Sequence, residues 1–283
     1  MTAPGWIVAL EIGAIVVLIA AIGTLLVKRS RRQKARCERL ARPFSEGEKR
    51  VLDRDFPRWR DIPGDLLPRF AGETRVLMEE KNFEPCGALT EVSDEMRLII
   101  SAQAALTIFG KKDHHYFPRL RSILVYPGAF RDHGRRRFDI PEAEDRGVLY
   151  GESWETGSVI LSWDNVVAGG RNADDGMNVV IHEFAHQLDQ YNGIADGIPQ
   201  LPDRAAYARW GAVMGPEYDA LVAASADRSG PGPFLDPYGA THPAEFFAVA
   251  SETFFEEPWD LVEEHRELYE ELAKFYGLDP ASW

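Results

Sequence analysis

The apolar positions of the chain form one long run and several shorter periodic stretches. The long run covers residues 6–27, and charge interrupts it only at Glu11. As a helix it measures about 33 Å, which is enough to cross a bilayer. It has no polar face over about six turns, which argues against a buried helix of a soluble domain. We therefore expect one N-terminal transmembrane helix over residues 6–27.

The charges on either side of this run predict its orientation. Six Lys or Arg residues lie within 28–36, whereas residues 1–5 carry no side-chain charge. A secretory signal has the opposite order, with basic residues ahead of its apolar core. By the positive-inside rule, residues 1–5 face outward and residues 28–283 stay in the cytoplasm. We expect a single-pass protein of the inner membrane, with a basic juxtamembrane linker over 28–44 and a cytoplasmic domain over 45–283.

Composition narrows the class of that domain. The formal net charge is −13, and residues 1–36 alone contribute +5, so the remainder carries −18. Such an acidic body is repelled by nucleic acid, which argues against direct nucleic-acid binding. The two cysteines, Cys37 and Cys86, lack the spacing of a metal site and are expected to be free thiols.

The shorter apolar stretches predict a mostly helical domain with a few strands. Ser45 and Glu48 have the spacing of a capping box, so a helix is expected from there to about Phe56. Strand 158–163 either forms a sheet edge that pairs with an extended peptide or lies in the sheet interior. A loop is expected over 164–173. The other expected elements are helices over 64–69, 72–83 and 91–109 and a strand over 122–126.

The most informative stretch is 179–189, which contains His182-Glu183-x-x-His186. Its broad apolar stripe predicts a helix. Asp174 and Asp175 are expected to cap its start, and Gly193 to end it. The polar face carries the remaining side chains of interest, namely Asn178, His182, His186 and Asp189.

This helix predicts a zinc site. Residues four apart share a helix face, so His182 and His186 can present two imidazole nitrogens to one ion. Glu183 lies beside them without being a ligand, where a general base is needed. The alternative is a buried helix with two histidines that are merely hydrogen-bonded.

A catalytic zinc usually has three protein ligands, so a third must come from elsewhere. In one class of zinc protease it is a His six residues after the second, but Asn192 occupies that position here. A carboxylate on a later helix, which opens at Pro243, is the better candidate. Spacing leaves both Glu245 and Glu252 open, and His242 is a further possible ligand.

Two motifs together carry a family resemblance. His182-Glu-Phe-Ala-His186-Gln-Leu-Asp189, with Tyr238-Gly-Ala-Thr-His-Pro-Ala-Glu245, resembles the Mlc titration factor A family of zinc-dependent peptidases. Segments 151–154 and 161–164 also resemble that family's pattern. The resemblance covers roughly residues 40–280. A weaker similarity is to the catalytic domain of anthrax lethal factor.

The resemblance implies roles for the remaining residues. Glu245 becomes the third ligand of one zinc ion per chain, and Tyr238 becomes the hydroxyl that faces the developing oxyanion. The alternative for Tyr238 is turn packing. Asp189 is opposed by the dipole of its own helix, so we expect it to hydrogen-bond a ligand imidazole or else to be exposed to solvent.

The expected fold is therefore α+β, a mainly helical zincin-like metallopeptidase domain with a small sheet, preceded by the transmembrane helix. The expected function is that of a membrane-anchored zinc peptidase, and by resemblance an aminopeptidase, acting on peptide substrates. Glu183 takes a proton from water and passes it to the leaving amine. The alternative function, also implied by the resemblance, is a binding protein that titrates a transcriptional repressor of sugar uptake.

Overall fold

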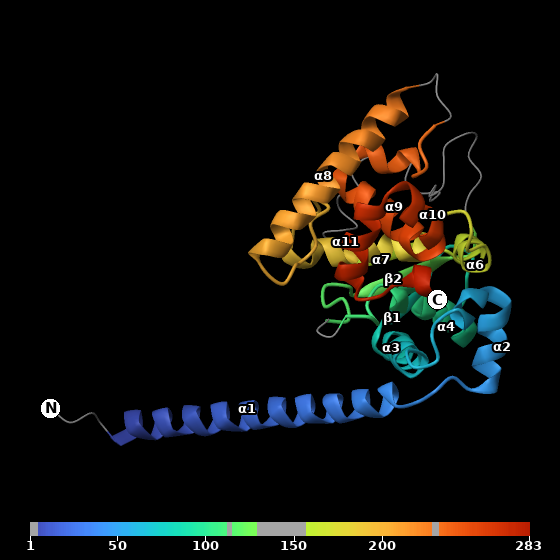
Figure 1. The fold of residues 1–283 in the computed structure, drawn as a ribbon. Helices are drawn as coiled ribbons and strands as arrows, with labels where there is room; N and C mark the ends of the chain where they lie inside the picture. The colour runs from blue at the N-terminus through green and yellow to red at the C-terminus, as the bar shows by residue number, and fades with distance from the viewer. Residues whose placement is uncertain (1–4, 112–114, 129–156, 228–231) are drawn as a thin grey trace.

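The computed structural model describes residues 5–111, 115–128, 157–227 and 232–283 of the 283-residue chain. Figure 1 shows a long N-terminal helix beside a body in which helices surround a small sheet. The expected α+β architecture, mainly helical with a small sheet, is confirmed. One feature of the sequence analysis, the family-like segment 151–154, lies outside the described residues.

The N-terminal helix, α1 (Gly5–Leu40), corrects two expectations. The apolar run and the basic segment form one continuous helix instead of a membrane helix and a linker. Over the part of the chain that the structure describes, no helix combines the length and the apolar character needed to cross a membrane. The predicted transmembrane helix over 6–27 and the single-pass inner-membrane localisation are thereby overturned.

The end of α1 is attached to the body through α3 (Leu67–Glu80). Arg39 Nε donates to Glu79 at 2.6 Å, and Arg36 Nε donates to Glu80 at 3.0 Å. The backbones approach so closely that a Cβ on Gly72 would lie 2.5 Å from the carbonyl oxygen of Leu40. Glycine is therefore the residue that allows this helix crossing.

Two further helices of the N-terminal half pack against each other. The first is α2 (Glu46–Asp55), where Ser45 and Glu48 form the expected capping box, followed by η1 (Pro57–Arg60). The second is α4 (Asp94–Leu106), a nearly fully buried helix capped by Ser93. Because α4 contacts both α3 and the metal-site helix α7 (Val179–Asp189), it links the N-terminal half to the site.

The sheet has three parallel strands in the order β1 (Asn82–Pro85), β2 (Ser122–Tyr126), β3 (Ser158–Ser162). In the described structure β3 has one neighbour, β2, so it is an edge strand. Burial alternates along β2 and β3, with Ile123 paired to Val159 on the buried face. The sheet therefore packs one face into the core.

The expected loop over 164–173 is wrong, because α6 (Trp163–Arg171) follows β3 directly. Gly169 and Gly170 lower the intrinsic helix propensity of this segment. Both are needed for close packing, since a Cβ on Gly170 would lie 2.3 Å from the carbonyl oxygen of Asp55. Tertiary contacts thus stabilise a helix that local sequence disfavours.

The C-terminal half is helical. Its elements after α7 are η3 (Gln190–Asn192), α8 (Arg204–Ala226), η4 (Pro237–Thr241), α9 (Pro243–Glu256), α10 (Pro258–Glu264), α11 (Arg266–Tyr276) and η5 (Pro280–Ser282). The helix α9 packs along α7, and its aromatic side chains Phe246, Phe247, Phe254 and Phe255 are fully or almost fully buried. This packing fixes the relative positions of the two helices that carry the candidate metal ligands.

Candidate metal centre

The metal-site helix begins at an asparagine. Asn178 is the N-cap of α7, and its Oδ1 accepts from the amides of Val180 at 3.1 Å and Ile181 at 3.0 Å. The predicted caps Asp174 and Asp175 are not at the helix start. Asp175 instead accepts from the Met177 amide in the preceding turn. The helix gives way to the turn η3, which ends at Gly193 with a positive φ of 97°.

Two helices bring the three expected ligands together. His182 and His186 come from the middle of α7, and Glu245 comes from the first turn of α9. All three are buried, with exposed fractions of 3%, 1% and 7%. Their ligand atoms lie within 4.8 Å of one another, which makes them a possible metal-binding group among the described residues.

The spacing of these atoms fits a tetrahedral ion. His182 Nε2 lies 3.0 Å from Glu245 Oε2 and 3.2 Å from His186 Nε2, and the third edge, from His186 Nε2 to Glu245 Oε2, is 3.3 Å. Zinc ligands at 2.0–2.1 Å define a tetrahedron with edges of about 3.3 Å. The two histidines and one glutamate therefore have both the donor atoms and the spacing of a zinc centre with one open position.

The electrostatics of the cluster favour a cation at its centre. Burial by itself would lower the pKa of His182, but the carboxylates of Glu252 and Glu245 outweigh this effect and raise it to about 10. Burial would raise the pKa of Glu245, but hydrogen bonds from His182 and His186 hold it well below its usual value. The carboxylates of Glu245 and Glu252 thus stabilise a positive charge placed between them, and a bound divalent cation would supply that charge.

The structure separates the two glutamates that spacing left open. Glu245 faces Nε2 of His182, whereas Glu252 lies at the other ring nitrogen, where Nδ1 of His182 donates to it at 2.8 Å. Glu252 is fully buried and also accepts from the amide of Asn178 at 2.5 Å. A carboxylate at this position orients a metal-binding imidazole and fixes its tautomer.

Gln103 is a site residue that the sequence analysis did not name, and Asn178 was named there only as part of the polar face of the helix. Asn178 Nδ2 donates to Gln103 Oε1 at 2.8 Å, and Gln103 Nε2 donates to the carbonyl oxygen of Val166 at 3.2 Å. Asn178 therefore caps α7 with its side chain and donates to Glu252 with its backbone amide. An Asn directly before an apolar helix is the signal that predicts such a cap.

Glu183 and Tyr238 lie beside the cluster. Glu183 is partly exposed, and burial raises the pKa of its carboxyl, with His186 and His182 opposing the shift. Tyr238 lies in η4 with its ring centroid 6.0 Å from that of His182. Asp236 caps this turn by accepting from the Tyr238 amide at 2.7 Å. The turn that carries Tyr238 therefore also brings its ring next to a candidate ligand.

Asp189 and His242 make their hydrogen bonds outside the cluster of His182, His186 and Glu245. Asp189 is fully buried, and its Oδ2 accepts from the Gly197 amide at 2.9 Å, while Oδ1 has no hydrogen-bond partner in the described residues. Burial raises the pKa of Asp189 to about 6, opposed by the Gly197 amide and His186. His242 is exposed and caps α9, with Nδ1 accepting from the Ala244 amide at 3.2 Å.

Two histidines and one glutamate are a donor set found at the metal sites of metallopeptidases. The family model described as glucose-regulated metallo-peptidase M90 matches residues 27–277, so the chain belongs to this family. The family implies a divalent metal, and the cluster of His182, His186 and Glu245 is compatible with one.

The relatives agree with this membership. The chain is 38% identical to an uncharacterized protein of Synechocystis sp. over 250 residues, or 82% of this chain and 88% of that protein. It is 37% identical to the Mlc titration factor A of Pectobacterium atrosepticum, over 56% of this chain and 59% of the relative. For the same factor from Serratia proteamaculans, the identity is 31% over 72% of this chain and 77% of the relative. The resemblance to the Mlc titration factor A family is confirmed.

Proposed function

We propose that the protein is a zinc-dependent peptidase. The observation that carries the proposal is the cluster of His182, His186 and Glu245, whose ligand atoms have the mutual distances of a tetrahedral site, with Glu183 next to the first histidine. Two imidazoles and one carboxylate are a donor set that zinc prefers in hydrolytic enzymes.

The residues of the chain have distinct roles in this reaction. When bound, the metal supplies Lewis-acid chemistry, lowering the pKa of water and polarising the carbonyl of the peptide. The carboxylate of Glu183 accepts the proton of the attacking water and returns it to the leaving amine. The Tyr238 hydroxyl donates a hydrogen bond to the oxyanion.

The direct test is hydrolysis of a broad set of short peptides by the full-length protein, before and after removal of zinc with a chelator. Cleavage that disappears with zinc and returns on its addition supports the proposal, and no cleavage by zinc-loaded protein contradicts it. Each peptide is used with a free and an acetylated N-terminus. Aminopeptidase action, the narrower proposal, requires that acetylation abolish cleavage.

The names of two relatives favour a second candidate function. Both are called Mlc titration factor A, so we propose binding of an Mlc-like transcriptional regulator as the alternative. Co-sedimentation of the purified protein with such a regulator tests it. A complex that forms equally well with Glu183→Gln and wild type would show binding that is independent of peptidase chemistry.

A further inference from the structure

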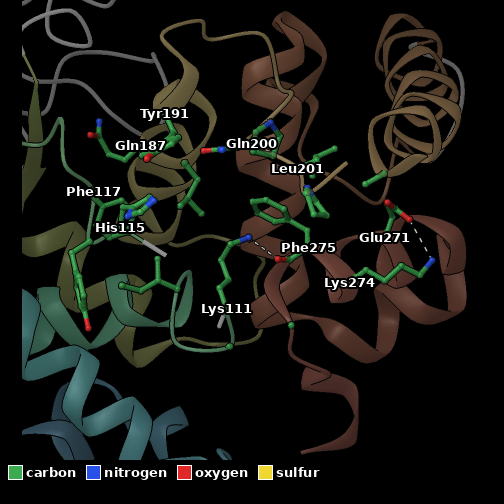
Figure 2. Close-up of a pocket in the computed structure, with 18 of the residues that line it drawn as sticks. Lys111, His115, Phe117, Gln187, Tyr191, Gln200, Leu201, Glu271, Lys274 and Phe275 are labelled. Atoms are coloured by element: carbon green, nitrogen blue, oxygen red, sulfur yellow. Dashed lines mark hydrogen bonds and ion pairs between the residues drawn. The ribbon is translucent and has the colours of Figure 1, made fainter. Parts of the chain in front are cut away.

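A large cavity lies next to the metal-site helix but apart from the metal ligands. It has a volume of about 680 Å³ and lies between the end of α7, the start of α8, the end of α11, Lys111 and residues 115–118 (Figure 2). This volume is in the range of small-molecule sites, roughly 300–1,000 Å³. None of His182, Glu183, His186, Tyr238 or Glu245 lines it. The cavity is therefore a separate candidate site.

Much of the cavity wall is apolar. Phe117, Leu188, Leu201 and Phe275 come from four different parts of the chain and line one space. Close by, His115 stacks on Tyr191 with ring centroids 5.4 Å apart and an angle of 10° between the rings. Such walls favour a ligand with an aliphatic or aromatic body, because its burial removes apolar surface from water.

The charged side chains of the lining are mostly cationic. The described lining residues include three basic side chains, Lys111, Arg209 and Lys274, and one acidic side chain, Glu271. Glu271 is already paired with Lys274 at 3.3 Å and lies 3.9 Å from Arg209. A cationic cavity in a chain of net charge −13 selects an anionic ligand over a cationic one.

Lys111 is the cation best placed to hold an anion. Its Nζ donates to the carbonyl oxygen of Phe275 at 2.6 Å and lies 3.4 Å from the centroid of the Phe275 ring (Figure 2). The carbonyl belongs to the last turn of α11, so the lysine also caps that helix. A carbonyl and a ring do not neutralise a full charge. Burial accordingly lowers the pKa of Lys111 to about 7.

We propose that this cavity binds a small carboxylic acid with an aromatic or aliphatic body, its carboxylate paired with Lys111 and its body against Phe117, Leu201 and Phe275. The ammonium group has three donor hydrogens, so it can bind a carboxylate while keeping its bond to Phe275. The proposal goes beyond the peptidase function, because no group of the metal centre takes part in it.

The test compares matched probes on the full-length protein. Binding of 3-phenylpropionate and of its uncharged amide is measured by isothermal titration calorimetry at pH 6, below the pKa of Lys111. The protein is treated with a chelator beforehand, so that a bound metal does not hold the acid. We expect the acid to bind at least about tenfold more tightly than the amide, the effect of one hydrogen bond to a charged group. Equal affinities for acid and amide, or no binding of the acid, would overturn the proposal.

Variants locate the binding. Lys111→Met keeps the aliphatic stem and should weaken binding of the acid about tenfold or more, bringing it to the level of the amide, whereas Lys111→Arg should retain most of the affinity. Lys49→Met, which removes an exposed lysine of α2, is the control and should leave affinity unchanged. Undiminished binding in a folded Lys111→Met protein would overturn the assignment. If that variant does not fold, the comparison of acid with amide on the wild type still decides.

Discussion

The carboxylate of Glu252 lies 2.8 Å from Nδ1 of His182, on the side of the imidazole that faces away from Glu245. Fixing the ring in this way lets Nε2 point at the metal position. We expect Glu252→Gln to weaken zinc affinity about 10- to 100-fold, as loss of such an orienting carboxylate typically does. Competition with a zinc chelator measures the affinity. Glu270→Gln, at an exposed position of α11, is the matched control, and equal affinities for the two variants would show that Glu252 does not orient the ligand.

The cap of the metal-site helix can be separated from its link to Gln103. Asn178→Ala removes both, so it should cost about 1 kcal/mol for the cap and a further ~1–3 kcal/mol for Gln103 Oε1, which loses its donor. Asn178→Ser restores a capping hydroxyl and should recover about 1 kcal/mol of the loss. Urea unfolding measures both variants. If Ser and Ala are equally destabilising, the side chain of Asn178 does not stabilise α7 as a cap.

Lys111 predicts a pH dependence of stability. Its pKa is about 7 in the folded protein and ordinary in the unfolded chain, about 10.4. Between these values the unfolded state binds more protons, so this residue makes the wild type more stable as pH rises from 7 to 10. The free energy of unfolding of wild type minus that of Lys111→Met should therefore increase over this range.

Urea unfolding of both proteins at several pH values provides the measurement. Subtracting the variant removes the contributions of the other titratable or charged groups in the described part of the cavity lining, which are His115, Tyr116, Tyr191, Arg209, Glu271 and Lys274. Parallel curves for the two proteins would mean that the Lys111 amine has an unperturbed pKa.

Tyr238 is expected to act on the transition state. Tyr238→Phe keeps the ring that lies near His182 and removes only the hydroxyl. Loss of one oxyanion donor typically lowers kcat about 10²- to 10³-fold, with little change in KM. Steady-state kinetics on a cleaved peptide measure both constants. A variant with wild-type kcat would assign Tyr238 to turn packing alone.

The sequence predicted the metal-site helix well because His182, Glu183 and His186 lie within one regular helix, where spacing determines the face. Spacing alone did not distinguish Glu245 from Glu252, since the two share a face of α9, and only the family resemblance assigned the ligand role to Glu245. The difference arises from how α9 crosses α7, which places one carboxylate at each nitrogen of the His182 ring. Such a crossing depends on packing between distant segments, which local patterns do not report.

Other misjudged elements have similar causes. The strand β1 is only four residues long, with one buried residue, Phe83, so it has no readable alternation. The helix α6 contains Gly169 and Gly170, which lower its local helix propensity. Both are required because backbone atoms distant in sequence pack closely against them. The apolar run at 6–27 was expected to be an independent membrane helix, but it is the first part of α1, which continues to Leu40. The last turns of α1 are held by contacts with α3.

The most direct test of the central claim is peptide hydrolysis by zinc-loaded wild type and Glu183→Gln, with the zinc content of both proteins measured. The substitution leaves His182, His186 and Glu245 in place and removes the proton acceptor. The account predicts one zinc per chain in both proteins, cleavage by the wild type and a loss of at least about 100-fold in kcat for the variant. Equal rates for the two proteins, or wild-type protein that holds zinc and cleaves no peptide, would contradict it.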